Sequence, residues 1–300
     1  MSLTHSVSIP LPPHAPDGGF DHGDVDPVTG RVFVAHTAGG AVEVIDGART
    51  SHHGTIVGCP EASGVLCAPR ARRVFAAARG AGTVLVIDAD SHGVAGEIAV
   101  GPKPNGLAWD GRRGRLLVAD VQDFRARLAD PRETTVVRET ALPGRPRWCV
   151  YDAAGDRFLI NVRDPACVAV LDAGTAAITA LWPVSSSGPH GLDLDAEQRR
   201  AFVACDGGRV VALDLDTGRE VAGAAIPGEP DAVWNNPDRS LLYVAVGRPG
   251  VVVVLDTREM AVVQEITTET GAHTTAFDRA RQRLYVFLPR TCAAAVYTEA

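Results

Sequence analysis

Seven polar residues recur at a nearly constant interval along this chain. They are Asp21, Ser63, Asn105, Arg147, His190, Asp231 and His273, with gaps of 42, 42, 42, 43, 41 and 42 residues. Five of the seven can carry a charge, which a position needed only for packing would not require. Imidazole and carboxylate groups are the side chains that bind metal ions and move protons. These residues could act together if the fold places equivalent positions of successive repeats side by side.

The histidines and acids concentrate in consecutive repeats, with His22 beside Asp21. We predict that His190, His273 and Asp231 are the catalytic residues. Two chemistries fit them. A divalent metal ion such as zinc, manganese or iron could be held by His190, Asp231, His273 and His22. Without a metal, a histidine with a nearby carboxylate would serve as a general acid–base pair near neutral pH.

The other ring positions favour substrate binding. Arg147 would lie across from the histidines and could hold a carboxylate or phosphate group by a bidentate contact. The predicted substrate-binding residues are Arg147, Asn105, Ser63, Asp21 and His36. His36 comes from a second repeating position, 15 residues after Asp21. The alternative is a merely solvated surface, where polar residues gather without a further role.

A second set of repeats predicts the elements that position these residues. Bulky anchors flanked by small and β-branched residues recur at Phe33, Phe75, Leu117, Leu159, Phe202, Tyr243 and Tyr285. An aspartate ends a strand-like run at Asp46, Asp88, Asp130, Asp172, Asp214 and Asp256. Periods of roughly 40–50 residues with several short strands per unit are typical of propeller blades. We therefore predict an all-β, seven-bladed β-propeller with four-stranded antiparallel blades, in a single domain spanning residues 1–300.

The ends of the chain predict how the ring closes. The fifth repeat contains four runs of strand length, at 189–195, 200–204, 209–214 and 219–226. The last repeat reaches its third strand at 293–297 and lacks a fourth. Residues 4–11 resemble a fourth strand, so we expect the N-terminal strand to complete the seventh blade and leave no open edge. Gly64, Gly106 and Gly191 stand near the start of the innermost strand, where the sheets crowd together.

The repeat also carries a family resemblance. The pattern Pro-x-Gly-Leu, Arg-x-Phe/Tyr-Val-Ala and Gly-x-Val-x-Val-x-Asp resembles the YVTN-type repeat of YncE-like seven-bladed propellers, over the whole chain. The resemblance implies the fold. Such propellers include binding proteins, scaffolds and enzymes, so it does not imply one function.

The repeat arrangement is more distantly similar to that of streptogramin lyase, a metal-assisted propeller enzyme. That resemblance implies histidines one blade apart around a magnesium ion, supported by a glutamate. Here the corresponding pair is Asp231 and His273, Gly271 stands where the acid is expected, and the Trp-Phe-Thr-type strand signature is absent. With these departures, the resemblance implies the location of a site and adds magnesium to the candidate metals, but it does not imply the same lyase reaction.

Composition limits the classes of partner that the protein can bind. The formal net charge of −7 disfavours a nucleic-acid partner, which would need a basic face. No run approaches the roughly eighteen apolar residues of a membrane span. The first residues, Met1 to Ser6, lack a signal-peptide pattern, and the six cysteines show no Cys-x-x-Cys spacing. We expect a cytoplasmic monomer with reduced thiols.

Two functional hypotheses remain open. The leading one is recognition of a small polar, anionic molecule at the axial mouth of the propeller, with metal-assisted lyase or hydrolase chemistry as an extension. The alternative is a non-catalytic scaffold that binds a protein partner on one face. A scaffold would show an apolar or aromatic patch on a face, whereas a site would show a deep polar pocket on the axis.

Overall fold

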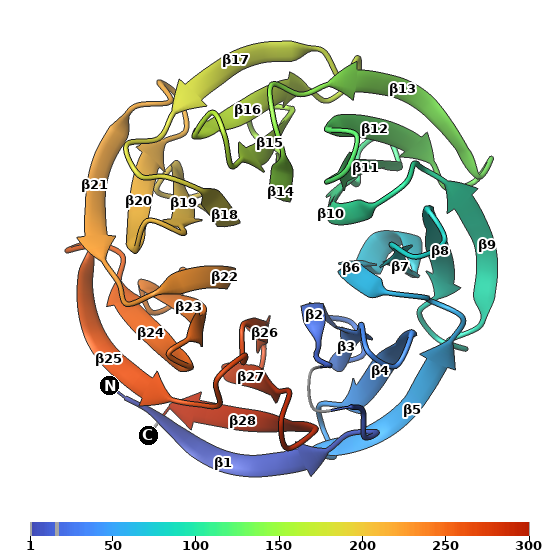
Figure 1. Cartoon of the computed structure of the whole chain (residues 1–300), viewed down its shortest axis with the longest axis vertical. Coiled ribbons are helices and arrows are strands. Elements are labelled where there is room, and N and C mark those ends of the chain that lie inside the picture. The colour runs from blue at the N-terminus through green and yellow to red at the C-terminus, as the bar shows by residue number, and fades with distance from the viewer. Residues whose placement is uncertain (1, 16–17, 300) are drawn as a thin grey trace.

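The computed structural model confirms a seven-bladed β-propeller. It describes residues 2–15 and 18–299, so Met1 and Ala300, the ends of the expected domain, lie outside the described residues. Seven four-stranded antiparallel sheets stand in a ring around a central opening (Figure 1). Within the described ranges no helix has the length and apolar character to cross a membrane.

The strands of the first four blades follow one another in sequence. Blade 1 contains β2 (Asp21–Asp26), β3 (Arg31–His36), β4 (Ala41–Asp46) and β5 (Ser51–Val57). Blade 2 contains β6 (Ala62–Ala68), the short 3-10 helix η1 (Pro69–Ala71), β7 (Arg73–Ala78), β8 (Thr83–Asp88) and β9 (Val94–Ala99). Blade 3 contains β10 (Pro104–Asp110), β11 (Arg115–Asp120), β12 (Arg125–Asp130) and β13 (Thr135–Ala141). Blade 4 contains β14 (Pro146–Asp152), β15 (Arg157–Val162), β16 (Cys167–Asp172) and β17 (Ile178–Pro183).

The last three blades include the closure of the ring. Blade 5 contains β18 (Pro189–Asp195), β19 (Arg200–Cys205), β20 (Arg209–Asp214) and β21 (Glu220–Ala225). Blade 6 contains β22 (Glu229–Asn236), β23 (Leu241–Arg248), β24 (Val251–Asp256) and β25 (Ala261–Thr267). Blade 7 combines β26 (Thr274–Asp278), β27 (Arg283–Leu288) and β28 (Ala293–Glu299) with the N-terminal strand β1 (Leu3–Pro10).

The two repeating markers have separate physical roles. The seven anchors lie in the second strand of each blade and are at most 1 % exposed, so they form the core between facing sheets. The aspartates that end the third strand make the following turns. Asp214, for example, accepts hydrogen bonds from the backbone N–H groups of Asp216 and Thr217. A carboxylate that satisfies two turn amides fixes the turn, which accounts for the recurrence of aspartate.

Blade 3 replaces valine by arginine on its third strand and compensates locally. Arg125 Nη1 and Arg127 Nε donate to the two carboxylate oxygens of Glu139 on β13, at 2.6 and 2.7 Å. Arg127 also pairs with Asp123. The irregular repeat therefore keeps the blade geometry through ion pairs between adjacent strands.

The N-terminal strand closes the ring as the sequence predicts. β1 pairs antiparallel with β28, with Ile9 opposite Ala294 and Leu3 opposite Glu299. Leu3 and Ile9 are 6 % and 1 % exposed, so the strand contributes to the core. Figure 1 shows both ends of the chain at the outer edge of blade 7. Among the described strands, blade 7 is the one blade that combines strands from both ends of the chain, so the β1–β28 pairing inside it closes the ring.

The inner strands approach one another most closely at glycines. A Cβ atom on Gly106 would lie 2.3 Å from the carbonyl oxygen of Arg147 in the next blade. The same construction on Gly64 and Gly191 meets the carbonyl oxygens of Asn105 and Asp231 at 2.0 Å. Each of these carbonyls belongs to a residue of the polar ring. Glycine therefore lets neighbouring ring residues come together at the axis.

Candidate functional site

A polar cavity of about 560 Å³ occupies the mouth of the axial channel. We call it the mouth cavity. Six of the seven ring residues line it together with His22, and the seventh, Ser63, does not. The ring residues reach it from the start of the innermost strand of each blade or from the connection before it. The structure thus brings together residues from six blades, as the repeat spacing predicts.

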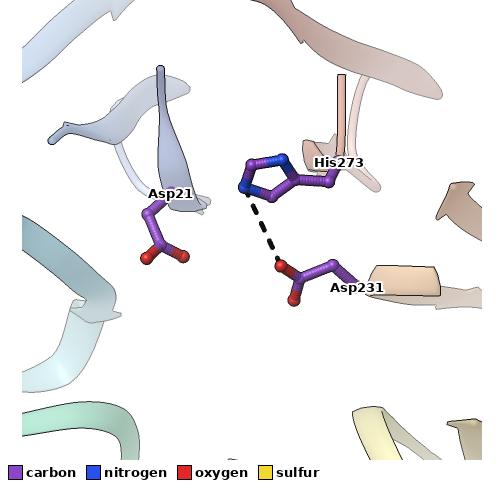
Figure 2. A group of neighbouring side chains, drawn as sticks. All are labelled: Asp21, Asp231 and His273. Atoms are coloured by element: carbon purple, nitrogen blue, oxygen red, sulfur yellow. Dashed lines mark ion pairs between the residues drawn. The ribbon is translucent and has the colours of Figure 1, made fainter. Parts of the chain in front are cut away.

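Two carboxylates and one imidazole form the tightest group in this cavity. Asp21, Asp231 and His273 each offer one ligand atom, and these three atoms all lie within 4.8 Å of one another. His273 Nε2 lies 3.9 Å from Asp231 Oδ2. Figure 2 shows the three side chains converging on the central opening, with the His273 ring directed toward Asp231. They come from blades 1, 6 and 7, so the group spans the closure of the ring.

The tautomer of His273 is set by the backbone. His273 Nδ1 lies 2.7 Å from the carbonyl oxygen of Gly271, which can only accept a hydrogen bond. Nδ1 therefore carries the proton, and in the neutral ring Nε2 keeps its lone pair facing the carboxylates. Metal-binding histidines are usually oriented in this way by a partner of the other ring nitrogen. The carbonyl group of Gly271 thus orients the His273 ring and fixes its tautomer.

His190 is oriented by a carboxylate instead. Its Nδ1 donates to Asp206 Oδ1 at 3.0 Å, and its Nε2 lies 3.4 Å from Asp231 Oδ1. Asp231 Oδ1 also accepts a hydrogen bond from Trp148 Nε1 at 2.9 Å. His190 thus approaches one oxygen of Asp231 while His273 approaches the other. His190 is therefore close to Asp231, but it is not one of the three residues whose ligand atoms all lie within 4.8 Å of one another.

The histidines decide the charge state of Asp231. Burial would raise the pKa of this carboxyl, but the electrostatic attraction of the His190, His273 and His22 imidazoles and the hydrogen bond from Trp148 outweigh burial and hold the pKa well below its ordinary value. Burial lowers the pKa of His22, against the attraction of Asp21 and Asp231. His22 Nε2 lies 3.4 Å from Asp21 Oδ1, and the ring is 7 % exposed. At neutral pH Asp231 is therefore ionised and His22 is neutral.

Arg147 lies in the same cavity without an acidic partner. Its buried Nε has no hydrogen-bond partner, and no ion pair joins its guanidinium to a residue in the described part of the chain. Burial lowers the pKa of Arg147, opposed by Asp231 and reinforced by Arg145 and Arg163. A half-buried cation that lacks a partner is costly, and an anion in the cavity would offset that cost.

Two predicted substrate-binding residues lie elsewhere. Ser63 is fully buried, and its hydroxyl donates to the carbonyl oxygen of Pro104 at 2.9 Å. His36 is 2 % exposed and does not line the mouth cavity. It lies 2.8 Å from both His14 Nδ1 and Glu43 Oε1, under the loop that joins β1 to β2. The end of the second strand in blade 1 turns its side chain between the sheets, so this position does not extend the ring.

The sequence analysis missed the charged residues of the connecting loops. Arg79, Arg163 and Asp206 line the mouth cavity, as do Glu229 and Arg248. Arg79 Nη2 donates to Asp21 Oδ2 at 2.7 Å, and Arg163 pairs with Asp206. Arg79, Arg163 and Asp206 stand one residue after the second repeating position, in the loop between the second and third strands. Extending the repeat register by one residue would have found them.

Comparisons with known proteins support the fold and leave the family open. No protein-family model matches the chain, and no curated protein matches it. Among solved structures, hydrazine synthase of Kuenenia stuttgartiensis is similar with a TM-score of 0.84 at 16 % identity, over 95 % of this chain and 97 % of that one. A chain of the mitotic checkpoint complex is similar with a TM-score of 0.84 at 13 % identity, over 99 % and 92 %. These likenesses show that the chain has the seven-bladed β-propeller fold, while membership of the YncE-like family stays a prediction.

Proposed function

We propose that the chain binds a small carboxylate- or phosphate-bearing molecule in the mouth cavity, beside a divalent metal ion. Arg147 carries the proposal, because it is a half-buried guanidinium without an acidic partner that shares a cavity with a group of metal-ligand type. Asp21, Asp231 and His273 would hold the metal, and Arg147 with Asn105 would hold the anion.

The charges of the cavity support a cation and an anion bound together. Four arginines and four acids line it: Arg79, Arg147, Arg163, Arg248, Asp21, Asp206, Glu229 and Asp231. With neutral histidines these charges cancel. An anion alone would make the cavity negative, and a divalent cation alone would make it positive. The pair therefore satisfies the electrostatics better than either ion by itself.

The donor set fits a hard or borderline metal. Two carboxylates and one imidazole suit manganese, zinc or ferrous iron, and magnesium accepts the carboxylates. Three protein ligands would leave positions open for water or for a ligand oxygen. His190 and His22 stand beside this group and would contact a bound ligand instead of the metal.

The arrangement also fits lyase or hydrolase chemistry. A bound metal ion would polarise a carbonyl or phosphoryl oxygen or acidify a water molecule. His190, held by Asp206 through Nδ1, presents Nε2 to the cavity and could accept a proton there. Arg147 would fix the anionic group across the cavity from this base. Without a metal, His190 and Asp231 retain the geometry of an acid–base pair.

The scaffold alternative has less support from the surface. A docking face would carry a continuous apolar patch. The large exposed hydrophobic side chains are mostly five valines and one leucine on the outermost strands of five blades: Val57, Val94, Leu181, Val221, Val262 and Val263. They are spread around the rim instead of gathering on one face. The similarity to a chain of the mitotic checkpoint complex keeps a protein partner as the second candidate.

Titration calorimetry on protein purified without a histidine tag tests the proposal. We expect Mn²⁺ to bind with a 1:1 stoichiometry, and inorganic phosphate to bind more tightly once Mn²⁺ is present. Asp231→Asn should weaken Mn²⁺ binding by roughly tenfold to 100-fold, because a charged ligand is lost. Arg147→Met should weaken phosphate by about tenfold and leave Mn²⁺ unchanged, since it removes only the guanidinium.

The control is Arg49→Met, whose side chain is 81 % exposed on the outer part of blade 1. It should leave both affinities unchanged. Saturable phosphate binding that is equal in wild type and Arg147→Met would contradict the proposed anion site. The metal site is refuted if Mn²⁺ and Zn²⁺ both fail to bind the wild-type protein.

A further inference from the structure

A second cavity lies deeper in the axial channel, below the mouth cavity. It has a volume of about 290 Å³, near the lower end of the roughly 300–1,000 Å³ range of small-molecule sites. We call it the lower chamber. His22 lines both cavities, and its ring centroid lies 4.2 Å from that of Trp148. His22 is thus shared by the two cavities, and Trp148 lines only the lower chamber.

Aromatic side chains form much of the wall of the lower chamber. Trp109, Tyr151 and Trp234 are half-buried around it, so part of each ring stays accessible, and Trp148 lies at its upper end. Trp148 and Trp234 pack edge to face, with centroids 6.2 Å apart. Three of the four tryptophans of the chain therefore meet in one small cavity. Indole and phenol faces carry the negative potential that attracts cations.

Two carboxyl groups face the lower chamber from opposite sides. Asp24 lies in β2 of blade 1, and Asp193 lies in β18 of blade 5, across the central opening in Figure 1. Asp24 Oδ2 accepts a hydrogen bond from the backbone N–H of Cys67, and Asp193 Oδ2 accepts one from Asn235. Each carboxylate is thus held in place by the next blade and retains lone pairs for a ligand.

Nothing in the wall balances these two acids. No lysine or arginine is among the described residues that line the lower chamber, and its histidine, His22, lies 3.4 Å from a carboxylate of its own, Asp21. We propose that the lower chamber binds a small organic cation, an alkylammonium or quaternary ammonium group, between Asp24 and Asp193 and against the tryptophan faces. Charge complementarity and aromatic walls together favour this ligand over an inorganic ion, which would lose its water without oxygen ligands on all sides.

The protonation of the two acids supports the same ligand. Burial raises the pKa of Asp24 to about 7 and that of Asp193 to about 6, against the hydrogen bonds from the backbone. Asp193 adds to the shift of Asp24, as does Asp26 at the end of the same strand, and Asp195 acts likewise on Asp193. A bound cation favours the ionised forms, so its affinity should rise as pH increases from about 5 to 8.

The thiols and the phenol at the lower chamber do not change charge in that range. Burial raises the pKa of Cys67 and Cys149, and it raises that of Tyr151 to about 12. Burial lowers the pKa of His22, although Asp21 and Asp231 act against it. A rise in affinity between pH 5 and 8 is therefore assigned to Asp24 and Asp193 only if it becomes smaller when either residue is replaced by asparagine.

Choline and its neutral isostere 3,3-dimethylbutan-1-ol test the proposal on the full-length protein. Tryptophan fluorescence and calorimetry at pH 8 should show saturable binding of choline and much weaker binding of the alcohol. Asp193→Asn should weaken choline binding by about tenfold, because it removes one charge and keeps the shape of the side chain. Asp24→Asn should act similarly, and the rise of affinity with pH should become smaller in each variant.

Two further variants keep the test decisive. Asp256→Asn removes a carboxylate from the end of β24, away from the axis, and should bind choline as wild type does. Val150→Phe fills the lower chamber without changing its charge and should abolish binding, even if an aspartate variant fails to fold. The proposal is overturned if wild type binds neither choline nor tetramethylammonium at millimolar concentration, or binds the alcohol equally well. Retained Mn²⁺ and phosphate binding in Val150→Phe would separate this site from the mouth cavity.

Discussion

Replacing Ile9 by alanine tests whether the N-terminal strand is a full member of blade 7. Ile9 is 1 % exposed and lies opposite Ala294 in the β1–β28 ladder. Ile98 occupies the equivalent place in β9, opposite Val84, and is 0 % exposed. Truncation of a buried isoleucine to alanine costs roughly 3 kcal/mol, from lost burial and the cavity left behind. With an unfolding entropy of about 2.1 cal/mol/K per residue, that cost lowers the Tm of a chain of this size by about 5 °C.

Urea and thermal unfolding of three variants provide the measurement. Ile9→Ala and Ile98→Ala should be destabilised to a similar extent, because each side chain is buried in the hydrophobic core between its own blade and the next blade. Val57→Ala is the control, since Val57 is 73 % exposed and should change stability by less than about 0.5 kcal/mol. If Ile9→Ala is as stable as Val57→Ala while Ile98→Ala is destabilised by roughly 3 kcal/mol, β1 does not belong to the cooperative fold and the closure is refuted.

Two further outcomes follow from particular contacts. Gly106→Ala should lower the free energy of unfolding by about 2 kcal/mol or more and weaken phosphate binding, because the new Cβ would press on the Arg147 carbonyl oxygen. Gly54→Ala is the control, since no atom lies within 4 Å of the added Cβ, and its stability should be nearly that of wild type. Equal unfolding curves for the two variants would contradict the close approach at Gly106. For Glu43, burial would raise the pKa, but hydrogen bonds from His36, Thr55 and His52 leave it below its ordinary value. The ionised carboxylate therefore stabilises the fold above about pH 4.3, and this stabilisation is lost as pH falls. The difference in Tm between wild type and Glu43→Gln should accordingly become smaller from pH 6 to pH 3. A difference that stays constant over this range would contradict a stabilising role for the ionised Glu43.

The fold could be predicted because it depends on local chemistry that is repeated seven times. Phe33 and its equivalents mark the mid-sheet position of each blade, and Asp46 and its equivalents mark a turn that needs a carboxylate. The closure followed from a missing fourth strand in the last repeat and a spare strand at the other end. Arg125 and Arg127 broke the pattern, yet Glu139 on the neighbouring strand compensates for them. A repeat pattern alone does not reveal such a pairing.

The site was predictable only in part, since a register places a residue on a blade without fixing where its side chain points. The ring positions of Asp21, Asp231 and His273 follow directly from the register. Ser63 has the same register, but its hydroxyl donates a hydrogen bond to the backbone carbonyl of Pro104, and the residue does not line the mouth cavity. His36 Nδ1 lies within hydrogen-bond distance of Glu43 Oε1, and the repeat pattern does not relate these two residues. The lower chamber depends on which residues of opposite blades face each other, and that requires the closed ring.

Asp21 and His273 lie on either side of the closure, so the proposed metal site depends on a closed ring. Asp21 lies near the beginning of the chain and His273 near its end, and the two become neighbours only after β28 has paired with β1. A chain that ends between His273 and β28 would contain every proposed ligand residue and, on this proposal, would still bind no metal ion. Occupancy of the proposed site would then distinguish closed rings from open ones, and an ion bound there would fasten the first blade to the last.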